Sequence, residues 1–138
     1  MALHLLKLSV GSASVETLAR WQATRLARTG ALFHETRHHP RRTGEILDGG
    51  SIYWVVKGFV RVRQRIVRLE RRASPERGRF CRIHLDPELI RTELQPRRPH
   101  QGWRYLEDMN APPDAPAGAV PEEPPREMAA ELRHLGLL

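Results

Sequence analysis

The segment His34-Glu35-Thr36-Arg37-His38 contains the residue types of a zinc hydrolase site, in the order H-E-x-x-H. In that motif, two histidines one helical turn apart bind zinc, and the glutamate activates a zinc-bound water molecule. The chemistry requires a helix, but Pro40 disfavours helical geometry at the residue before it, and Gly30 lies just upstream. No apolar stripe supports a helix between them. We therefore interpret the segment as a polar, extended stretch and predict no metal site.

The other reactive residue types do not form a recognisable catalytic pattern. Cys81 is the only thiol, and His84 follows three positions later, so in a strand the two side chains face opposite sides. Asp86 and Glu88 flank a proline in a turn, where carboxylates commonly cap backbone N–H groups. Asp48-Gly49-Gly50-Ser51 is too short for a phosphate-binding loop and precedes a strand. The sequence thus identifies no catalytic residue and no cofactor.

Arginine spacing favours a different chemistry, the binding of phosphates. Arg61, Arg63 and Arg65 alternate along a predicted strand while Val60 and Val62 face the core. This places three guanidinium groups on one face about 6.6 to 6.8 Å apart, close to the phosphate spacing of a single strand. Loop arginines and two aromatic residues that can stack on bases complete the candidate nucleic-acid-binding set: Arg37, Arg41, Arg42, Arg97, Arg98, Arg104, Trp103 and Tyr105.

A structural explanation of the same residues remains open. On this view the arginines form a solvated face that holds Glu70, Glu88 and Glu93 in ion pairs, and Trp103 is buried beneath a proline-rich arm. The strong preference for arginine over lysine is also what a genome rich in G and C produces. The sequence alone does not decide between a phosphate-binding surface and an ion-paired one.

A possible pocket is predicted along the strand that follows Ser51. Tyr53 and Trp54 point to opposite faces of this strand, so at most one of them lines a site. Lys57 and Gly58 come next, where the glycine allows a ligand to approach the backbone closely and the lysine supplies a polar group. We take Trp54, Lys57 and Gly58 as the candidate pocket residues.

Charge is distributed unevenly along the 138 residues, which carry a formal net charge of +7. Residues 1–104 contain 21 basic and 9 acidic side chains, whereas residues 105–138 contain 2 and 7. A basic body attracts phosphates, acidic proteins or anionic lipid, and an acidic tail can screen it. Because no apolar run approaches the roughly 20 residues of a membrane span and Cys81 is the only cysteine, we expect a cytoplasmic protein without membrane contact.

Periodicity and turn signals predict the elements that position these residues. A helix runs from an N-cap at Ser14 to Thr29, and a short helix passes through residues 45–47. Lys57-Gly58 predicts a bulge or bend, and residues 59–85 an antiparallel hairpin. The strands are expected at residues 4–10, 52–56, 59–69 and 80–85.

We predict one basic α+β domain over residues 1–110, with the helix packed on a curved, mostly antiparallel sheet or a small, partly closed β-barrel. Residues 111–125 form an acidic, proline-rich linker. Residues 126–138 form a C-terminal helix with an apolar stripe of Met128, Leu132 and Leu135.

Several segments together resemble a known family over nearly the whole chain. They are Leu3-His4-Leu5-Leu6-Lys7-Leu8, Thr36-Arg37 with Pro40, Leu47-Asp48-Gly49-Gly50-Ser51-Ile52-Tyr53-Trp54-Val55-Val56-Lys57-Gly58, Arg63-Gln64-Arg65-Ile66 and Gln101-Gly102-Trp103-Arg104-Tyr105-Leu106. The chain looks like an alphaproteobacterial family of uncharacterised proteins, a domain of unknown function of about 140 residues. The resemblance implies no reaction, cofactor or catalytic residue. The chain departs from the family pattern at Leu94, where the family has proline, and at His100, where it has phenylalanine.

The order of elements is also similar to PUA-like barrels, the small modules related to the RNA-binding domain of pseudouridine synthase and archaeosine transglycosylase. This likeness and the arginine pattern favour a non-catalytic RNA-binding accessory protein as the leading function. One alternative is a protein-interaction module that binds a partner through its C-terminal helix. The other is an enzyme that acts on a nucleotide or a modified base.

Overall fold

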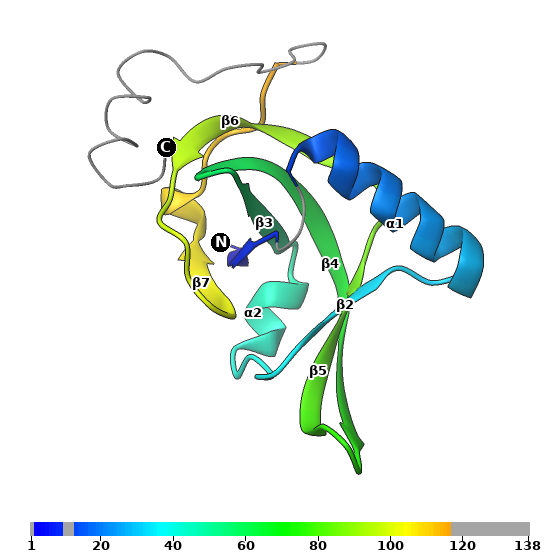
Figure 1. Cartoon of the computed structure of the whole chain (residues 1–138). Coiled ribbons are helices and arrows are strands. Elements are labelled where there is room, and N and C mark those ends of the chain that lie inside the picture. Colours follow the sequence, from blue (N-terminus) through cyan, green and yellow to red (C-terminus); the bar gives the residue numbers. More distant parts are fainter. Residues whose placement is uncertain (1, 10–12, 117–138) are drawn as a thin grey trace.

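The computed structural model describes residues 2–9 and 13–116, as a curved sheet with a helix along one side (Figure 1). The elements are β1 (Leu3–Leu8), α1 (Val15–Thr29), β2 (Phe33–Thr36), α2 (Thr43–Leu47), β3 (Ser51–Val56), β4 (Phe59–Ser74), β5 (Gly78–Leu85), β6 (Ile90–Pro96), β7 (Trp103–Glu107) and the 3-10 helix η1 (Asp108–Asn110). The far end of the β4–β5 hairpin extends away from the rest of the molecule.

Seven strands form one mixed sheet in the order β2-β5-β4-β3-β1-β7, with β6 paired to β4 beside this path. Strands β1 and β3 run parallel, and the other pairs in the described residues are antiparallel. Strand β4 is 16 residues long, and its first half pairs with β3 and β6 while its second half pairs with β5. The long strand therefore joins two parts of the sheet, one that contains β3 and β6 and one that contains β5. The described strands form an open sheet, so the partly closed barrel that was one of our expectations is not supported.

The chain after η1 runs back along β6. The Glu93 N–H donates to the Pro113 carbonyl and the Ala115 N–H donates to the Arg91 carbonyl, each at 2.9 Å. The first residues of the predicted linker are therefore paired with the sheet. The rest of that linker and the predicted helix over residues 126–138 lie outside the described residues.

Helix α1 begins and ends where the sequence predicts. The Ser14 side chain accepts a hydrogen bond from the Thr17 N–H at 3.1 Å, and Gly30 follows the last helical turn. Leu18 and Gln22 are buried on the side of the helix that faces the sheet. The cap and the apolar spacing were sufficient to predict this element.

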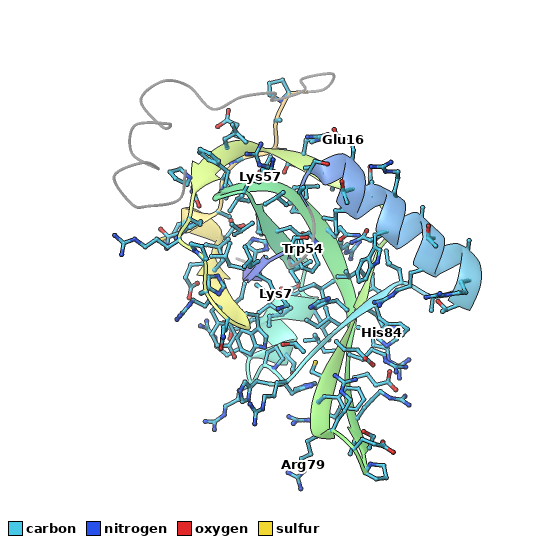
Figure 2. All side chains as sticks on the ribbon, in the orientation of Figure 1. Lys7, Glu16, Trp54, Lys57, Arg79 and His84 are labelled. Atoms are coloured by element: carbon cyan, nitrogen blue, oxygen red, sulfur yellow. The ribbon has the colours of Figure 1, made fainter. Side chains whose placement is uncertain are left out.

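Lys57 and Gly58 form the tight turn between β3 and β4. Their φ angles of 50° and 80° are both positive, which is the geometry of a two-residue type I′ hairpin. Of the bulge or bend predicted at these residues, the structure has the bend. A bulge lies further along β4, since Trp54 pairs with Val62 and Val55 with Val60, which leaves Arg61 without a partner on β3. Figure 2 shows Lys57 at the far end of these strands from the β4–β5 hairpin.

The bulge at Arg61 changes which face the neighbouring side chains occupy. Val60 packs with Tyr53 in one buried cluster, whereas Val62 packs with Trp54 in another. The prediction that Val60 and Val62 share one face is therefore wrong, because the extra residue reverses the alternation between them. The central strands consequently have a buried cluster on each face of the sheet.

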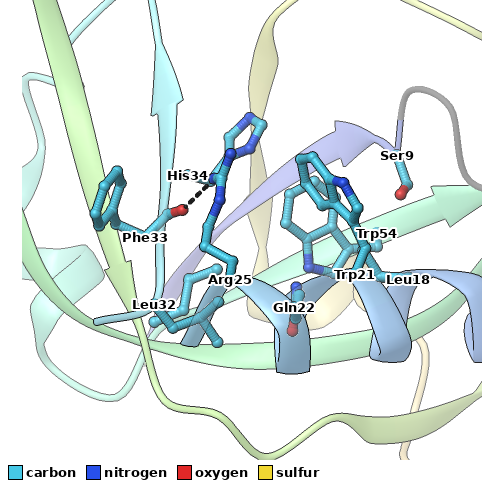
Figure 3. Close-up of a pocket in the computed structure, with 10 residues that line it drawn as sticks. Ser9, Leu18, Trp21, Gln22, Arg25, Leu32, Phe33, His34 and Trp54 are labelled. Carbon is cyan, nitrogen blue, oxygen red and sulfur yellow. Dashed lines mark hydrogen bonds between the residues drawn. The ribbon is translucent and has the colours of Figure 1, made fainter. Parts of the chain in front are cut away.

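A buried amide on β4 connects α1 to the sheet. Gln64 is 0% exposed, and its Oε1 accepts hydrogen bonds from Gln22 Nε2 and Trp54 Nε1, both at 2.8 Å. Its Nε2 donates to Gln22 Oε1 at 2.8 Å and to the Asp86 carbonyl at 3.1 Å. Figure 3 shows Gln22 reaching from the helix toward Trp54. All four hydrogen-bonding positions of the Gln64 amide are thus used.

Substitution Gln64→Leu is expected to lower the free energy of unfolding by about 2 to 4 kcal/mol, because the isosteric side chain leaves the Trp54 N–H and the Gln22 amide buried without partners. Urea denaturation followed by tryptophan fluorescence measures the change. The exposed Gln101→Leu variant serves as the control and should match the parent. A Gln64→Leu protein as stable as the parent would contradict the role given to this amide.

Candidate nucleic-acid interface

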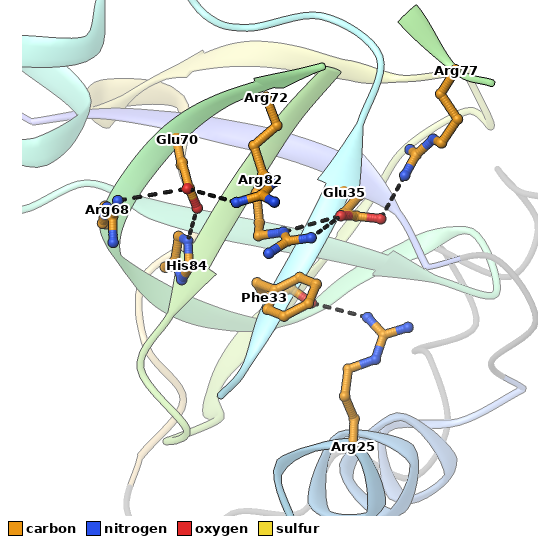
Figure 4. A network of polar contacts seen from close by, with 9 residues as sticks. All are labelled: Arg25, Phe33, Glu35, Arg68, Glu70, Arg72, Arg77, Arg82 and His84. Atoms are coloured by element: carbon orange, nitrogen blue, oxygen red, sulfur yellow. Dashed lines mark hydrogen bonds and ion pairs between the residues drawn. The ribbon is translucent and has the colours of Figure 1, made fainter. Parts of the chain in front are cut away.

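The outer face of β2, β4 and β5, which carries Glu35 and Glu70, holds several arginines in ion pairs (Figure 4). Glu35 accepts hydrogen bonds from Arg77 at 2.7 Å and from Arg82 at 2.9 Å. Burial raises the pKa of Glu35, but the hydrogen bonds from Arg77 and Arg82 outweigh it and hold the pKa below its ordinary value. The Arg82 guanidinium also lies 4.1 Å from the centre of the Phe33 ring. These guanidinium groups are committed to partners within the protein.

A second carboxylate completes the network on the same face. Glu70 contacts His84 at 2.9 Å, Arg72 at 3.0 Å and Arg68 at 3.7 Å. The hydrogen bond from His84 makes the largest contribution to a lowered pKa of Glu70. Of the three carboxylates named in the ion-paired interpretation, Glu70 is paired, whereas Glu88 and Glu93 form no ion pair within the described residues.

The three arginines of the first half of β4 do not form a free row. Arg61 Nε donates to the Val56 carbonyl at 2.7 Å. Arg63 makes two hydrogen bonds to Asp114, at 2.7 and 2.8 Å, and a third to Ser51 Oγ at 3.0 Å. Of the three, Arg65 alone is exposed and has no side-chain hydrogen bond or ion pair within the described residues. The structure therefore does not bring these side chains together as a phosphate-binding set.

Trp103 and Tyr105 anchor the loop that follows β2. Trp103 Nε1 donates to the His38 carbonyl at 2.8 Å. The Tyr105 hydroxyl accepts hydrogen bonds from the backbone N–H groups of Arg41 at 3.0 Å and Arg42 at 3.3 Å. The two rings contact each other edge to face, with centroids 4.9 Å apart. These aromatic residues position the loop, which is a role that sequence reasoning had not assigned to them.

The other residues of the predicted nucleic-acid-binding set, and those of the predicted pocket, do not gather at one site. Arg42 pairs with Glu45 and with Glu107, and Arg97 Nε donates to Gln95 at 3.0 Å. Arg98 and Arg104 are exposed. Among the candidate pocket residues, Trp54 lines a cavity under α1, whereas Lys57 and Gly58 belong to the β3–β4 turn and are not among the residues that line it.

Two of the predicted loop arginines do meet other basic residues, in an open cleft of about 690 Å³ between residues 37–41 and the β4–β5 hairpin. We call it the basic cleft. Figure 2 shows Arg79 at the far end of this hairpin. The lining residues are five arginines, two histidines, an alanine and a phenylalanine: Arg37, Arg41, Arg71, Arg72, Arg79, His38, His39, Ala73 and Phe80. Among the described residues, no carboxylate lines the cleft.

Most of the cleft arginines have no ion-pair partner among the residues that the structure describes. Within residues 2–9 and 13–116, Arg37, Arg41, Arg71 and Arg79 form no ion pair, whereas Arg72 pairs with Glu70. Burial, followed by the charge of Arg71, lowers the pKa of His39. The lowered pKa favours the neutral form of His39 near pH 7, and the guanidinium groups carry a permanent positive charge in the cleft.

Sequence reasoning missed Arg71, Arg72 and Arg79 because the predicted strand ended at residue 69, while β4 continues to Ser74. The register of the predicted hairpin could have identified these three arginines. Arg71 pairs with Cys81, and Ala73 pairs with Arg79. Counting outward from the predicted turn at residues 74–78 gives these same pairs and places Arg71 and Arg79 on one face.

The inner face of β2 carries a half-buried histidine, His34, whose pKa is lowered. Burial, reinforced by the charges of Lys7 and Arg25, lowers the pKa of His34 to about 4. The ring contacts Trp54 edge to face, with centroids 5.2 Å apart. His34 is therefore neutral at physiological pH.

This lowered pKa makes stability depend on pH. His34 binds a proton near pH 6.5 in the unfolded chain and near pH 4 in the folded chain. The contribution of neutral His34 to the free energy of unfolding is therefore complete above about pH 6.5 and is lost as the pH falls toward 4. The loss attributable to this group is on the order of 2 kcal/mol. Urea denaturation at pH 7 and pH 4.5 should show a smaller acid loss for His34→Phe than for the parent. Equal losses in the two proteins would contradict the assignment, since the other titrating groups are common to both.

The H-E-x-x-H segment is extended, as predicted, because Phe33–Thr36 is a strand. Within the described residues, no group of three or more His, Cys, Asp and Glu side chains has an arrangement that could hold a metal ion. No helix in the described ranges has the length and apolar character needed to cross a membrane.

Comparison with known proteins identifies a family. No curated protein and no solved structure matches the chain. A family model described as "Protein of unknown function (DUF1489)" matches residues 5–138, which is nearly the entire chain. The chain therefore belongs to this family, the domain of unknown function DUF1489.

Proposed function

We propose that the chain is a non-catalytic, cytoplasmic RNA-binding accessory protein that holds RNA phosphates in the basic cleft. The observation that carries the proposal is the lining of the cleft, in which five arginines and two histidines of the described residues meet with no carboxylate among them. Guanidinium groups match phosphate oxygens with paired N–H donors. A cleft of this composition favours a polyanion over a neutral or cationic ligand.

The spacing of the cleft arginines suits a ligand with repeated charges. Arg71 and Arg79 are diagonal neighbours on the facing strands, since Ala73 is the residue opposite Arg79. Diagonal neighbours on one face of an antiparallel pair lie about 7 to 8 Å apart. The two guanidinium groups therefore reach different phosphates of a chain, while Arg37 and Arg41 approach from the loop on the other wall.

The cleft has little aromatic surface on which bases can stack. Phe80 is buried, and the Arg77 guanidinium covers its ring at 4.0 Å from the centre. Trp103 and Tyr105 contact the backbone of the loop instead of lining the cleft. We therefore expect recognition of the phosphate backbone with little preference for base sequence.

Removal of the Tyr105 hydroxyl tests whether the loop must be held in place. Tyr105→Phe leaves the N–H groups of Arg41 and Arg42 without their acceptor, and we expect RNA affinity to fall about three- to tenfold as the loop loses its position. Fluorescence anisotropy measures the affinity, and urea denaturation establishes that the body of the fold is intact. Unchanged affinity would contradict the anchoring role.

The proposal is tested by titrating the full chain into labelled single-stranded RNA, duplex RNA and duplex DNA at about 50 and 200 mM salt. We expect RNA to bind more tightly than DNA and the affinity to fall steeply at the higher salt concentration. Weak binding that does not depend on salt would contradict phosphate binding. Equal or tighter binding of duplex DNA would contradict the assignment to RNA.

A further inference from the structure

A cavity of about 170 Å³ lies between α1 and the inner face of the sheet (Figure 3). Its walls are mainly aromatic and aliphatic, and they include Trp54 of β3, Leu18 of α1 and Leu32. Trp21 of α1 also lines the cavity and is 56% exposed. The cavity is separate from the basic cleft, because the two share no lining residue.

Two polar side chains of the lining are available to a ligand. The Nε2 atom of His34 is buried and has no hydrogen-bond partner within the described residues. Buried polar groups in proteins almost always have a partner, so an unpaired imidazole nitrogen beside a cavity marks a position where a ligand atom can bind. His34 comes from β2, and its ring contacts that of Trp54.

Arg25 is the second polar group. One of its terminal nitrogens, Nη1, donates to the Phe33 carbonyl at 3.0 Å, and its guanidinium carbon lies 4.6 Å from the centre of the Trp21 ring. These contacts fix the side chain in the lining of the cavity. Within the described residues Arg25 forms no ion pair, and the lining contains no Asp or Glu. The guanidinium group therefore keeps N–H donors and a positive charge for a ligand.

We propose that this cavity binds a single-ring aromatic carboxylate. The volume fits such a ring, since an apolar cavity of about 150 Å³ is large enough to hold benzene. The indole of Trp54 and the leucines surround the ring, and the carboxylate pairs with Arg25, the cation of the lining. The neutral imidazole of His34 donates its Nε2–H to the second carboxylate oxygen. The charge of Arg25 selects an anion, and the aromatic walls select a planar ring.

Benzoate is the probe for this proposal, with benzyl alcohol and cyclohexanecarboxylate as matched comparisons that lack the charge or the planar ring. By isothermal titration calorimetry with the full chain, we expect benzoate to bind with a Kd of about 1 mM or tighter, and each comparison compound to bind about tenfold more weakly. Absence of benzoate binding at 10 mM, or equal binding of benzyl alcohol, would overturn the proposal.

Three variants separate binding in the cavity from a general effect of charge on anion binding. Arg25→Met should weaken benzoate binding about tenfold, and Leu18→Phe, which fills the space with a larger side chain, should abolish it. Arg28→Met removes the same charge from an exposed position on α1 and should leave binding unchanged. Circular dichroism confirms the fold of each protein. Equal loss in Arg25→Met and Arg28→Met would overturn the assignment of the carboxylate site.

Discussion

Replacing Arg37, Arg41, Arg71 and Arg79 together by glutamine is expected to lower the affinity for single-stranded RNA by about 100-fold or more at 50 mM salt. These four side chains line the basic cleft and have no ion-pair partner within the described residues, so their loss removes phosphate contacts without breaking the folded network. The slope of log affinity against log salt should decrease by about 3, because each lost phosphate contact contributes about 0.7. Fluorescence anisotropy over a salt series measures both quantities.

A variant with the same change in net charge provides the control. Arg20, Arg28, Arg65 and Arg98 are exposed, lie outside the cleft lining and have no ion pair within the described residues. Their replacement by glutamine should reduce affinity less than about tenfold, through the weaker long-range field alone. If the two variants lose affinity equally, binding depends on net charge and not on the cleft.

Substitution Gly50→Ala is expected to lower the free energy of unfolding by about 3 kcal/mol or more. A Cβ at this position would collide with the carbonyl oxygens of Ile46 and Leu3, which belong to α2 and β1. Because both obstacles are backbone atoms, no side-chain rearrangement relieves the collision. The Gly50 N–H also donates to the Ile46 carbonyl at 2.7 Å, so the backbone is held in place. Thermal and urea denaturation measure the loss.

Gly44→Ala is the matched comparison for that substitution. Gly44 lies in α2, and a Cβ there would meet no atom of residues 2–9 and 13–116 within 4 Å. Alanine is a better helix former than glycine, so this variant should be stabilised by about 0.5 to 1 kcal/mol. Similar effects of the two substitutions would contradict the close approach of backbone at Gly50.

Local signals predicted the elements of the fold well where one short motif decides the structure. Ser14 followed by an apolar helical spacing predicted α1, and the turn residues 74–78 predicted the β4–β5 hairpin. The parallel pairing of β1 with β3 has no such local signal, because it depends on how a chain segment of more than forty residues returns to the sheet. For the same reason the sequence did not distinguish an open sheet from a barrel.

The candidate site was predicted only in part, because it too depends on contacts between residues that are distant in sequence. A charge count along the chain identified a basic body and the loop arginines Arg37 and Arg41, but a count does not show which guanidinium groups find a carboxylate. Arg63 is paired by Asp114, which is 51 residues away in sequence. The sequence also did not indicate that the hydroxyl of Tyr105 holds the loop backbone. Long-range pairs of this kind come from the tertiary fold.

The central claim is that RNA contacts the basic cleft, and photo-crosslinking tests it most directly. Single-stranded RNA containing 4-thiouridine is bound to the full chain, irradiated and digested, and the modified peptides are identified by mass spectrometry. We expect crosslinks in peptides that cover residues 37–41 and 71–80, and we expect them to disappear at high salt. Crosslinks confined to residues 61–65 or 97–105, with none on the walls of the cleft, would contradict the account.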